Sequence, residues 1–191
     1  MSATASMSEH GELPLPPVDK PTNWFIRLLF RAAKQRYGVT PTAFRVMYAR
    51  SPFLAVVTLV VTIGVTRFLR LSHELTALVQ VSLAMRNGCT FCADIGLAEA
   101  ARARVGRERF RDLLAFEDSA SFSAREKAAL AYVKALHESL HIPDAVWAEL
   151  KANFSERERI DLVWICAVEQ YFNTMAMPLR IGSDHLADRA V

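Results

Sequence analysis

The spacing of apolar and polar positions along this 191-residue chain predicts helices throughout. Apolar residues recur at intervals of three and four, and no segment alternates apolar with polar residues long enough to predict a strand. Most of the expected helices begin or end at a Ser, Thr, Pro or Gly signal. They cover residues 22–37, 40–49, 52–69, 73–86, 89–106, 108–116, 123–138, 143–153 and 155–175. The pattern therefore predicts an all-α protein.

The apolar stretch Phe53 to Val65 is the ambiguous part of this pattern. Its β-branched residues favour a strand, but its length and the absence of flanking hairpin turns favour a helix. A membrane span needs about twenty apolar residues, more than this stretch provides. A helix that is apolar nearly all round is buried on several sides, and a chain of this size offers limited cover. We therefore expect a buried helix or a subunit interface in a homo-oligomer.

The length fits a single domain, which we place at residues 21–181. Residues 1–20 are polar and contain several prolines, so we expect a disordered N-terminal tail, and residues 182–191 are expected to form a C-terminal tail. The N-terminal tail lacks the basic start and apolar run of a signal peptide. Three cysteines are an odd number, which argues against a secreted disulfide framework. These features predict a cytoplasmic protein.

Charge is unevenly distributed along the chain. The net charge is only +3, which gives no reason to expect a nucleic-acid partner. From Lys20 to Arg70 there are nine Lys or Arg residues and no Asp or Glu, whereas acidic residues are frequent from Glu74 onward. We expect the basic part to pack on the acidic remainder or on a neighbouring subunit. Contact with a membrane surface is the alternative interpretation.

Cys89 and Cys92 form a Cys-x-x-Cys pair just after the helix-ending Asn87-Gly88 and at the start of the next helix. Residues three apart on a helix have Cα atoms about 5–6 Å apart, which a disulfide tolerates. A helix N-terminus also favours the reactive thiolate. A thioredoxin-like site would need a preceding strand, and a zinc site would need further ligands that the chain does not supply at suitable spacing. We expect a redox pair that uses no metal and no cofactor.

The order of several motifs resembles the AhpD-like, carboxymuconolactone decarboxylase family over roughly residues 38–181. The matching runs are Leu71-Ser72-x-Glu74-Leu75, Asn87-Gly88-Cys89-x-Phe91-Cys92, Phe122-Ser123-x-Arg125-Glu126-Lys127-Ala128-Ala129-Leu130 and Phe154-Ser155-Glu156-x-Glu158, with a late Asn173. The resemblance implies an oligomeric AhpD-like helical bundle. It also implies a hydroperoxide or disulfide substrate and a dithiol reductant such as a lipoyl group.

The chain departs from the peroxidase members of that family at the positions of their proton relay. Those members carry a Glu twelve residues before the first cysteine and a His four residues after the second, and these positions are Ala77 and Gly96 here. A positioned acid or base contributes about 10²–10⁴ in rate. Thiol–disulfide exchange depends less on such a group. His73, one turn before Ala77, is a candidate replacement, whereas Asp94, Glu169 and His137 are not assigned to a site.

These observations predict a dithiol/disulfide oxidoreductase in which Cys89 and Cys92 cycle, with weak alkylhydroperoxide reductase activity at most. Position at the helix start favours Cys89 as the thiol of lower pKa, whereas the resemblance implies that Cys92 attacks a peroxide and Cys89 resolves. Cys166, on an apolar helical face, is expected to be a core thiol. Two alternatives stay open: a decarboxylase-like small-molecule enzyme in which the cysteines are dispensable, and a non-catalytic protein that acts in binding or assembly.

Overall fold

The computed structural model of the protein describes residues 12–190, apart from the side chain of Thr66. The structure is built from α-helices and short turns of other helix types, and the described residues contain no strand, so the predicted all-α class is confirmed. The α-helices are α1 (Trp24–Tyr37), α2 (Pro52–Arg67), α3 (His73–Asn87), α4 (Thr90–Arg102), α5 (Ala124–Glu138), α6 (Asp144–Asn153), α7 (Glu156–Ala176) and α8 (Leu186–Arg189).

Helix starts are set by side-chain caps that can be read from the sequence. Ser123 and Ser155 each accept a hydrogen bond from the backbone N–H three residues ahead, and the glutamate at that position bonds back to the serine N–H. These two capping boxes satisfy donors that would otherwise lack a partner at the first turns of α5 and α7. Asn23 and Ser72 cap α1 and α3 in the simpler way.

The end of α3 decides where the cysteines begin. Gly88 adopts φ 76°, in the left-handed region where a side chain is disfavoured, and its N–H bonds back to the carbonyls of Ala84 and Met85. The next residue, Cys89, is then the N-cap of α4. This turn folds α4 back along α3.

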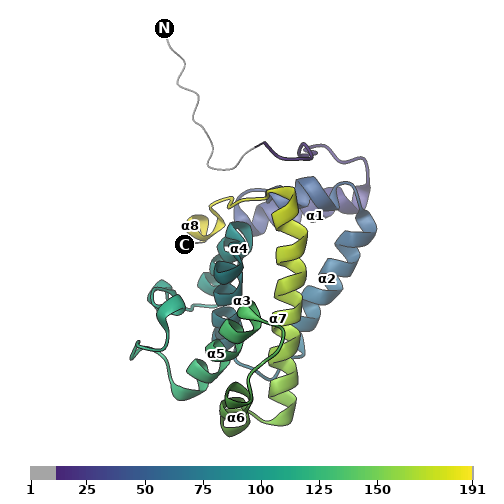
Figure 1. Ribbon diagram of the computed structural model, residues 1–191. Helices are drawn as coiled ribbons and strands as arrows, with labels where there is room; N and C mark the ends of the chain where they lie inside the picture. The colour runs from purple at the N-terminus through teal and green to yellow at the C-terminus, as the bar shows by residue number, and fades with distance from the viewer. Residues whose placement is uncertain (1–11, 191) are drawn as a thin grey trace.

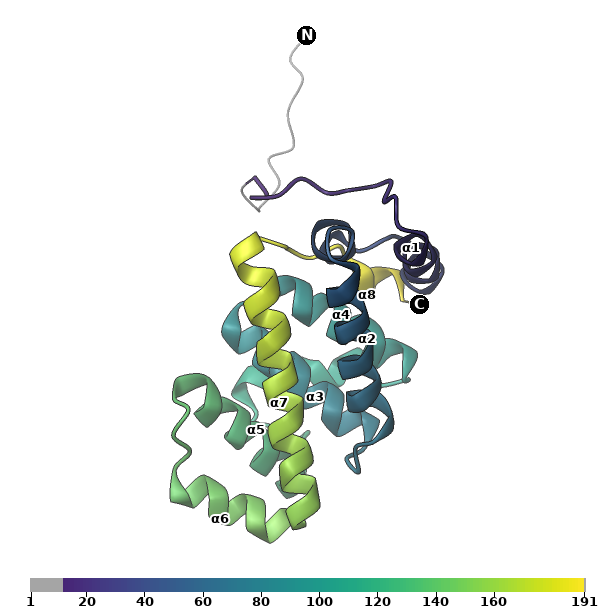
Figure 2. The same cartoon turned by 90° about the vertical axis from the view of Figure 1, so that its right-hand side faces the viewer.

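Helix α3 lies at the centre of the bundle and packs against α4, α5 and α7. Figures 1 and 2 show α7 running along the molecule beside α3, with α1 at one end and α6 at the other. Three clusters of buried residues fill the interior: one between α1, the 43–48 turn and α4, one between α3, α5 and α7, and one around Phe110 and Leu113. The cysteine pair belongs to the first of them.

Two expected helices take other forms. In place of an α-helix over residues 40–49, Phe44–Tyr48 form a π-type turn, in which the Ala49 N–H reaches the Phe44 carbonyl five residues back at 3.0 Å. Residues 108–116 form two short 3-10 turns, Arg107–Phe110 and Leu113–Ala115, neither of which has a side-chain cap. Without a cap or length, an α-helical nucleus is costly there.

The two predicted tails differ in what the structure describes. Residues 1–11 of the expected N-terminal tail lie outside the described residues. At the C-terminal end, residues 183–187 are held against α4, and Leu186 is fully buried. Within the described part of the chain, no helix combines the length and the hydropathy needed to cross a membrane.

Candidate redox site

The two cysteines at the start of α4 form a disulfide, with their Cα atoms 5.3 Å apart as the spacing predicts. Cys89 is the N-cap of α4, and its Sγ lies 3.3 Å from the backbone N of Cys92, which donates toward it. The sulfur thus takes the place of the usual cap oxygen, at the positive end of the helix dipole. If the disulfide is reduced, this position favours a thiolate on Cys89.

The pair is buried in apolar surroundings, with Cys89 2% and Cys92 5% exposed. Both belong to a cluster of side chains from α1, the 43–48 turn, α4 and the end of α7, which includes Phe30, Tyr37, Val46, Met47, Tyr48, Phe91 and Ala176. Desolvation disfavours thiolate and therefore opposes the effect of the helix start. The arrangement protects the pair from bulk water and restricts access to small or flexible molecules.

A hydrogen-bonded group of polar side chains borders the pair. The Asn87 side chain, two residues before Cys89, donates from Nδ2 to Gln170 Oε1 and to Asn173 Oδ1, both at 2.8 Å. On its other side, Asn87 Oδ1 lies 2.8 Å from His137 Nδ1 at the end of α5. The Asn87 side chain therefore ties the end of α3 to α5 and α7 just where the motif begins.

Glu169 lies at the buried end of this group, 5% exposed on α7. Its Oε1 accepts a hydrogen bond of 2.6 Å from Asn173 Nδ2, and its carboxylate also bonds to the Gln80 side chain on α3. Burial raises the pKa of Glu169 to about 7, although both hydrogen bonds oppose the shift. The sequence left the surroundings of Glu169 undecided, and the structure places it inside the bundle.

Close packing of α4 on α3 explains one departure from the peroxidase pattern. A Cβ on Gly96 would lie 2.9 Å from Cγ2 of Val81, closer than two carbon atoms can approach without displacement. A histidine therefore does not fit at residue 96 without moving a stiff, β-branched neighbour. Ala77, at the position of the relay carboxylate, packs against the apolar cluster around Phe110 and Leu113.

The structure does not bring His73, the candidate relay residue, to the cysteines. His73 is exposed at the first position of α3, while the pair follows the last position of that helix. At 1.5 Å per residue the two ends of α3 are about 20 Å apart. Residues that sequence reasoning did not select, Asn87 and Glu169 with its partners, lie much nearer to the motif.

Asp94, one turn into α4, has a structural role. Its carboxylate accepts hydrogen bonds from Ser183 Oγ at 2.9 Å and from three backbone N–H groups of residues 184, 186 and 187. It thereby fixes the C-terminal segment over α4. Cys166 is fully buried on α7, and burial together with the nearby Glu169 carboxylate raises the pKa of its thiol, which fits the expected core role. Among the described residues, no three His, Cys, Asp or Glu side chains gather as a metal site would require.

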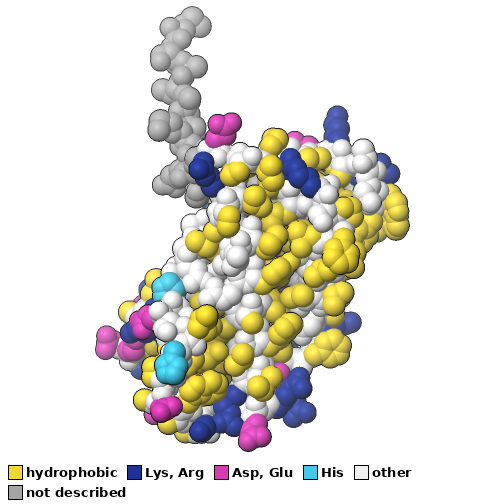
Figure 3. Space-filling model, turned by 45° about the vertical axis from the view of Figure 1, so that its right-hand side comes forward, with side chains coloured by type: hydrophobic (Ala, Val, Ile, Leu, Met, Phe, Trp, Pro, Cys, Tyr) yellow, Lys and Arg dark blue, Asp and Glu magenta, His cyan; other side chains and the backbone are white. Residues whose placement is uncertain are grey.

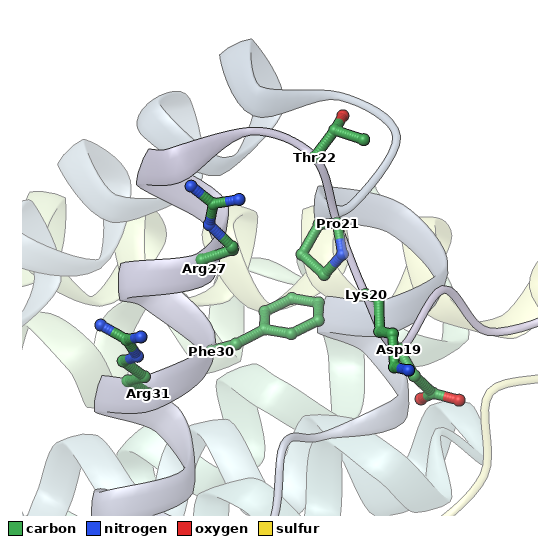
Figure 4. Close-up of a pocket in the computed structure, with 7 residues that line it drawn as sticks. All are labelled: Asp19, Lys20, Pro21, Thr22, Arg27, Phe30 and Arg31. Atoms are coloured by element: carbon green, nitrogen blue, oxygen red, sulfur yellow. The ribbon is translucent and has the colours of Figure 1, made fainter.

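An open basic hollow of about 470 Å³ lies apart from these residues, between α1 and the preceding segment 19–22. Figure 4 shows Arg27 and Arg31 one above the other along α1, with the Phe30 ring pointing toward Pro21. Asp19 at its edge pairs with Arg45 at 2.8 Å. The hollow shares Phe30 with the cluster around the cysteines, but none of its lining residues carries a thiol.

Comparison with known proteins shows what this chain is similar to. Residues 65–135, which contain the cysteine motif, match the sequence model of the Carboxymuconolactone decarboxylase family. A relative in Bacillus subtilis (strain 168), the uncharacterized protein YdfG, is 29% identical over 90 residues. That match covers 46% of this chain, and the chain spans about three fifths (61%) of the length of YdfG.

Solved structures share the fold over nearly the whole chain. The alkylhydroperoxidase AhpD core of an uncharacterized peroxidase-related protein from Ralstonia eutropha JMP134 is 17% identical, with a TM-score of 0.77 over 92% of this chain and 95% of its own. The debrominase Bmp8 is 20% identical, with a TM-score of 0.80 over 94% of this chain and 96% of its own. The predicted AhpD-like helical fold is therefore confirmed, and the part that carries the cysteine motif matches the Carboxymuconolactone decarboxylase family model.

Proposed function

We propose that the protein is a dithiol/disulfide oxidoreductase in which Cys89 and Cys92 alternate between dithiol and disulfide. The observation that carries the proposal is the disulfide at the first turn of α4, with Cys89 as the helix cap. The helix start favours thiolate on reduction, and the pair can close again without movement of the backbone, because its Cα atoms already lie 5.3 Å apart. Cys166 takes no part, since it forms no disulfide and lies on α7 in a different cluster of buried residues.

Two half-reactions describe the cycle. In the reductive half, one thiolate of a small dithiol, such as a lipoyl group, attacks one sulfur of the pair and breaks the S–S bond. The second donor thiol then attacks the mixed disulfide, so the donor is oxidised to a disulfide and the pair gains two electrons and two protons. In the oxidative half, the two thiols reduce a hydroperoxide to an alcohol and water and become a disulfide again.

The surroundings of the pair make hydroperoxide reduction the slower of these steps. A departing alkoxide needs a proton, and residues 77 and 96 supply neither carboxylate nor imidazole. The absence of a positioned acid–base group typically costs about 10²–10⁴ in rate. Exchange with another disulfide needs less proton transfer, so disulfides and reactive small acceptors are the substrates that the site suits best.

The test is a thiol count with matched cysteine variants. The protein as described here should present one free thiol when unfolded, that of Cys166, and three after treatment with dihydrolipoamide. A hydroperoxide or a small disulfide should return the count to one. Cys89→Ser and Cys92→Ser should each abolish turnover, whereas Cys166→Ser should leave it intact. Turnover that survives in both single variants would show that the pair is not the working site.

A brominated aromatic is a second candidate acceptor. The debrominase Bmp8 shares the fold almost completely, and a cysteine-to-alanine variant of it was solved in complex with 2,3,4-tribromopyrrole. In this chain, the aromatic and apolar side chains around Cys89 and Cys92 would suit such a compound. The balanced reaction replaces C–Br by C–H, forms the disulfide and releases HBr. Bromide release by the reduced protein, absent in Cys89→Ser and Cys92→Ser, would support this substrate class.

Self-association is the remaining part of the proposal. Four large apolar residues of α2 form what we call its outer face: Phe53, Val56, Leu59 and Val60, exposed by 79%, 46%, 45% and 64%. Figure 3 shows hydrophobic side chains as a broad band down this side of the molecule. No charged residue occurs from Phe53 to Thr66. An uncharged apolar face needs an apolar partner, and a second copy of the chain offers the same face across a two-fold axis.

A further inference from the structure

Three carboxylates lie buried in the described part of the chain, and they differ in how their charge is balanced. Asp94 accepts four hydrogen bonds from the C-terminal segment. Asp161 accepts the Arg70 N–H at 2.9 Å and pairs with Arg157 at 2.9 Å. Glu169 is held by neutral amide side chains, and no cation pairs with it among residues 12–190. Glu169 therefore differs from the two aspartates in that, among the described residues, amide side chains alone hold its carboxylate.

The amide partners of Glu169 connect it to the cysteine motif. Asn173 donates to Glu169 and accepts from Asn87, so two hydrogen bonds separate the carboxylate from the residue two positions before Cys89. Phe172, which follows Glu169 on α7 by one turn, packs against the cluster that contains both cysteines. The carboxylate and the disulfide are therefore both buried and are linked through Asn173, Asn87 and the Phe172 ring.

The orientation of Asn87 also fixes the proton at the exposed end of this group. Because Asn87 Nδ2 donates to Gln170 and Asn173, its Oδ1 faces His137 and can only accept. His137 therefore carries a hydrogen on Nδ1. The chain of hydrogen bonds runs from an exposed imidazole, through two amides, to a buried carboxylate.

Reduction of a buried disulfide is sensitive to the charge of groups nearby. When a donor thiolate breaks the S–S bond, the departing sulfur bears a negative charge in surroundings that disfavour charge. A second buried negative charge nearby opposes this step, whereas a neutral carboxyl does not. The protonation state of a neighbouring carboxyl therefore controls how easily the pair is opened.

We propose that Glu169 is a positioning residue whose proton is coupled to the redox state of Cys89 and Cys92. The inference rests on the proposed dithiol function. Glu169 acts where Ala77 and Gly96 leave the pair without a relay, but through its charge and its amide partners rather than by contact with the substrate. The neutral carboxyl permits a thiolate to form on the departing sulfur, whereas the ionised carboxylate opposes its formation.

Few other titratable groups face this carboxyl. On α7 itself they are Cys166 one turn earlier and the Asp161–Arg157 pair two turns earlier. From α5 come His137, through Asn87, and Tyr132, whose pKa is raised to about 12 mainly by burial. From α3 comes the neutral Gln80, from α4 the cysteine pair, and α2 carries no charge from Phe53 to Thr66.

The test is the pH dependence of disulfide reduction in the full chain. The rate constant for reduction by dithiothreitol, expressed per donor thiolate, should fall about three- to ten-fold as the pH rises through about 7, the pKa of Glu169. Glu169→Gln should remove this fall, which we call the pH step, and hold the rate constant at its low-pH value. Glu99→Gln, also a carboxylate-to-amide change but on the half-exposed side of α4, should keep the wild-type profile.

Two further variants make the result decisive. His137 is the other ionisable side chain of this hydrogen-bonded group, so His137→Gln must keep the fall in rate if Glu169 is its origin. Gln80→Leu removes a hydrogen bond that favours the charged form of Glu169, so the pH step should move to higher pH, which also tests the inference if Glu169→Gln folds poorly. A pH step that persists in Glu169→Gln, or does not move in Gln80→Leu, overturns the inference. A disulfide that no dithiol reduces in the wild type overturns the proposed function as well.

Discussion

Two glycines in helix interiors, Gly64 of α2 and Gly96 of α4, lie in opposite surroundings. Outside its own helix and chain neighbours, no atom of the described residues lies within 4 Å of a Cβ built on Gly64. A Cβ on Gly96 would lie 2.9 Å from Val81. The contact of α4 with α3 therefore has no room for a Cβ at residue 96, while residue 64 of α2 borders open space. The region that holds the cysteines is fixed by packing, and the outer face of α2 is not.

The two helices therefore differ in what their surroundings allow. Near the cysteines, packing of α4 on α3 constrains residue 96, because a histidine there, as in the peroxidase pattern, must displace a methyl group of Val81. On the outer face of α2, large apolar side chains occupy exposed positions. Packing within one chain accounts for the residues of α4, whereas the exposed apolar face of α2 indicates a partner.

The largest expected effect comes from placing the missing histidine. Gly96→His should lower the free energy of unfolding by about 3 kcal/mol or more, because the side chain must displace Val81 in a filled contact. Gly64→His should change it by less than about 1 kcal/mol, since a side chain there meets no neighbour and gains helix propensity over glycine. Urea unfolding of both variants measures the difference.

A double variant checks the cause of that loss. Val81→Ala removes the methyl groups that oppose residue 96, so Val81→Ala/Gly96→His should be more stable than Gly96→His alone, although Val81→Ala by itself is destabilising. Equal losses for histidine at residues 64 and 96 would contradict the contrast between the two helices.

The second effect is a pH-dependent gain in the free energy of unfolding on replacing Glu169 by glutamine. Burial raises the pKa of Glu169 from 4.5 to about 7, so the folded state pays for the ionised carboxylate at alkaline pH. Well below pH 4.5 the carboxyl is neutral in both the folded and the unfolded state, and the cost vanishes. The cost grows as the pH rises from about 4.5 and is complete above about 7. Glu169→Gln should therefore be more stable than wild type by about 3 kcal/mol at pH 8 and by less than about 1 kcal/mol at pH 5. Thermal or urea unfolding at the two values tests this sign.

A smaller loss is expected at the turn between α3 and α4. Asn87→Ala removes the hydrogen bonds to Gln170, Asn173 and His137. The buried Asn173 Oδ1 then loses the N–H group that donates to it. The free energy of unfolding should fall by about 1–2 kcal/mol. Asn153→Ala, which loses one exposed bond to the Glu149 carbonyl, is the matched control and should change it by less than about 0.5 kcal/mol. Similar losses in both variants would show that the network adds no stability.

The same contrast explains what could be predicted from the sequence. Helix boundaries follow from local signals, so the capping boxes at Ser123 and Ser155 and the turn at Gly88 place α5, α7 and the cysteines correctly. The spacing of Cys89 and Cys92 likewise predicts their disulfide. These features depend on residues within a few positions of one another.

Contacts between distant segments were beyond the same reasoning. Asn87 meets Asn173 across 86 positions, and Asp94 meets residue 186 across 92. No local pattern marks such pairs, because either residue alone is an ordinary polar side chain on a helix. A polar residue on the apolar face of α7, as at Glu169, was the one available signal, and only packing shows what it faces.

The last prediction concerns the outer face of α2, where large side chains should contribute least to the fold of one chain. Phe53→Ser/Val60→Ser should leave the free energy of unfolding of the monomer within about 0.5 kcal/mol of wild type, because both side chains are more than half exposed. Val65→Ser, on the buried side of the same helix at 5% exposure, should lower it by about 2 kcal/mol. In sedimentation equilibrium, the wild type should exceed the 21.4 kDa of one chain and the double variant should not. A wild type that stays at the mass of one chain at high concentration would show that another partner covers this face.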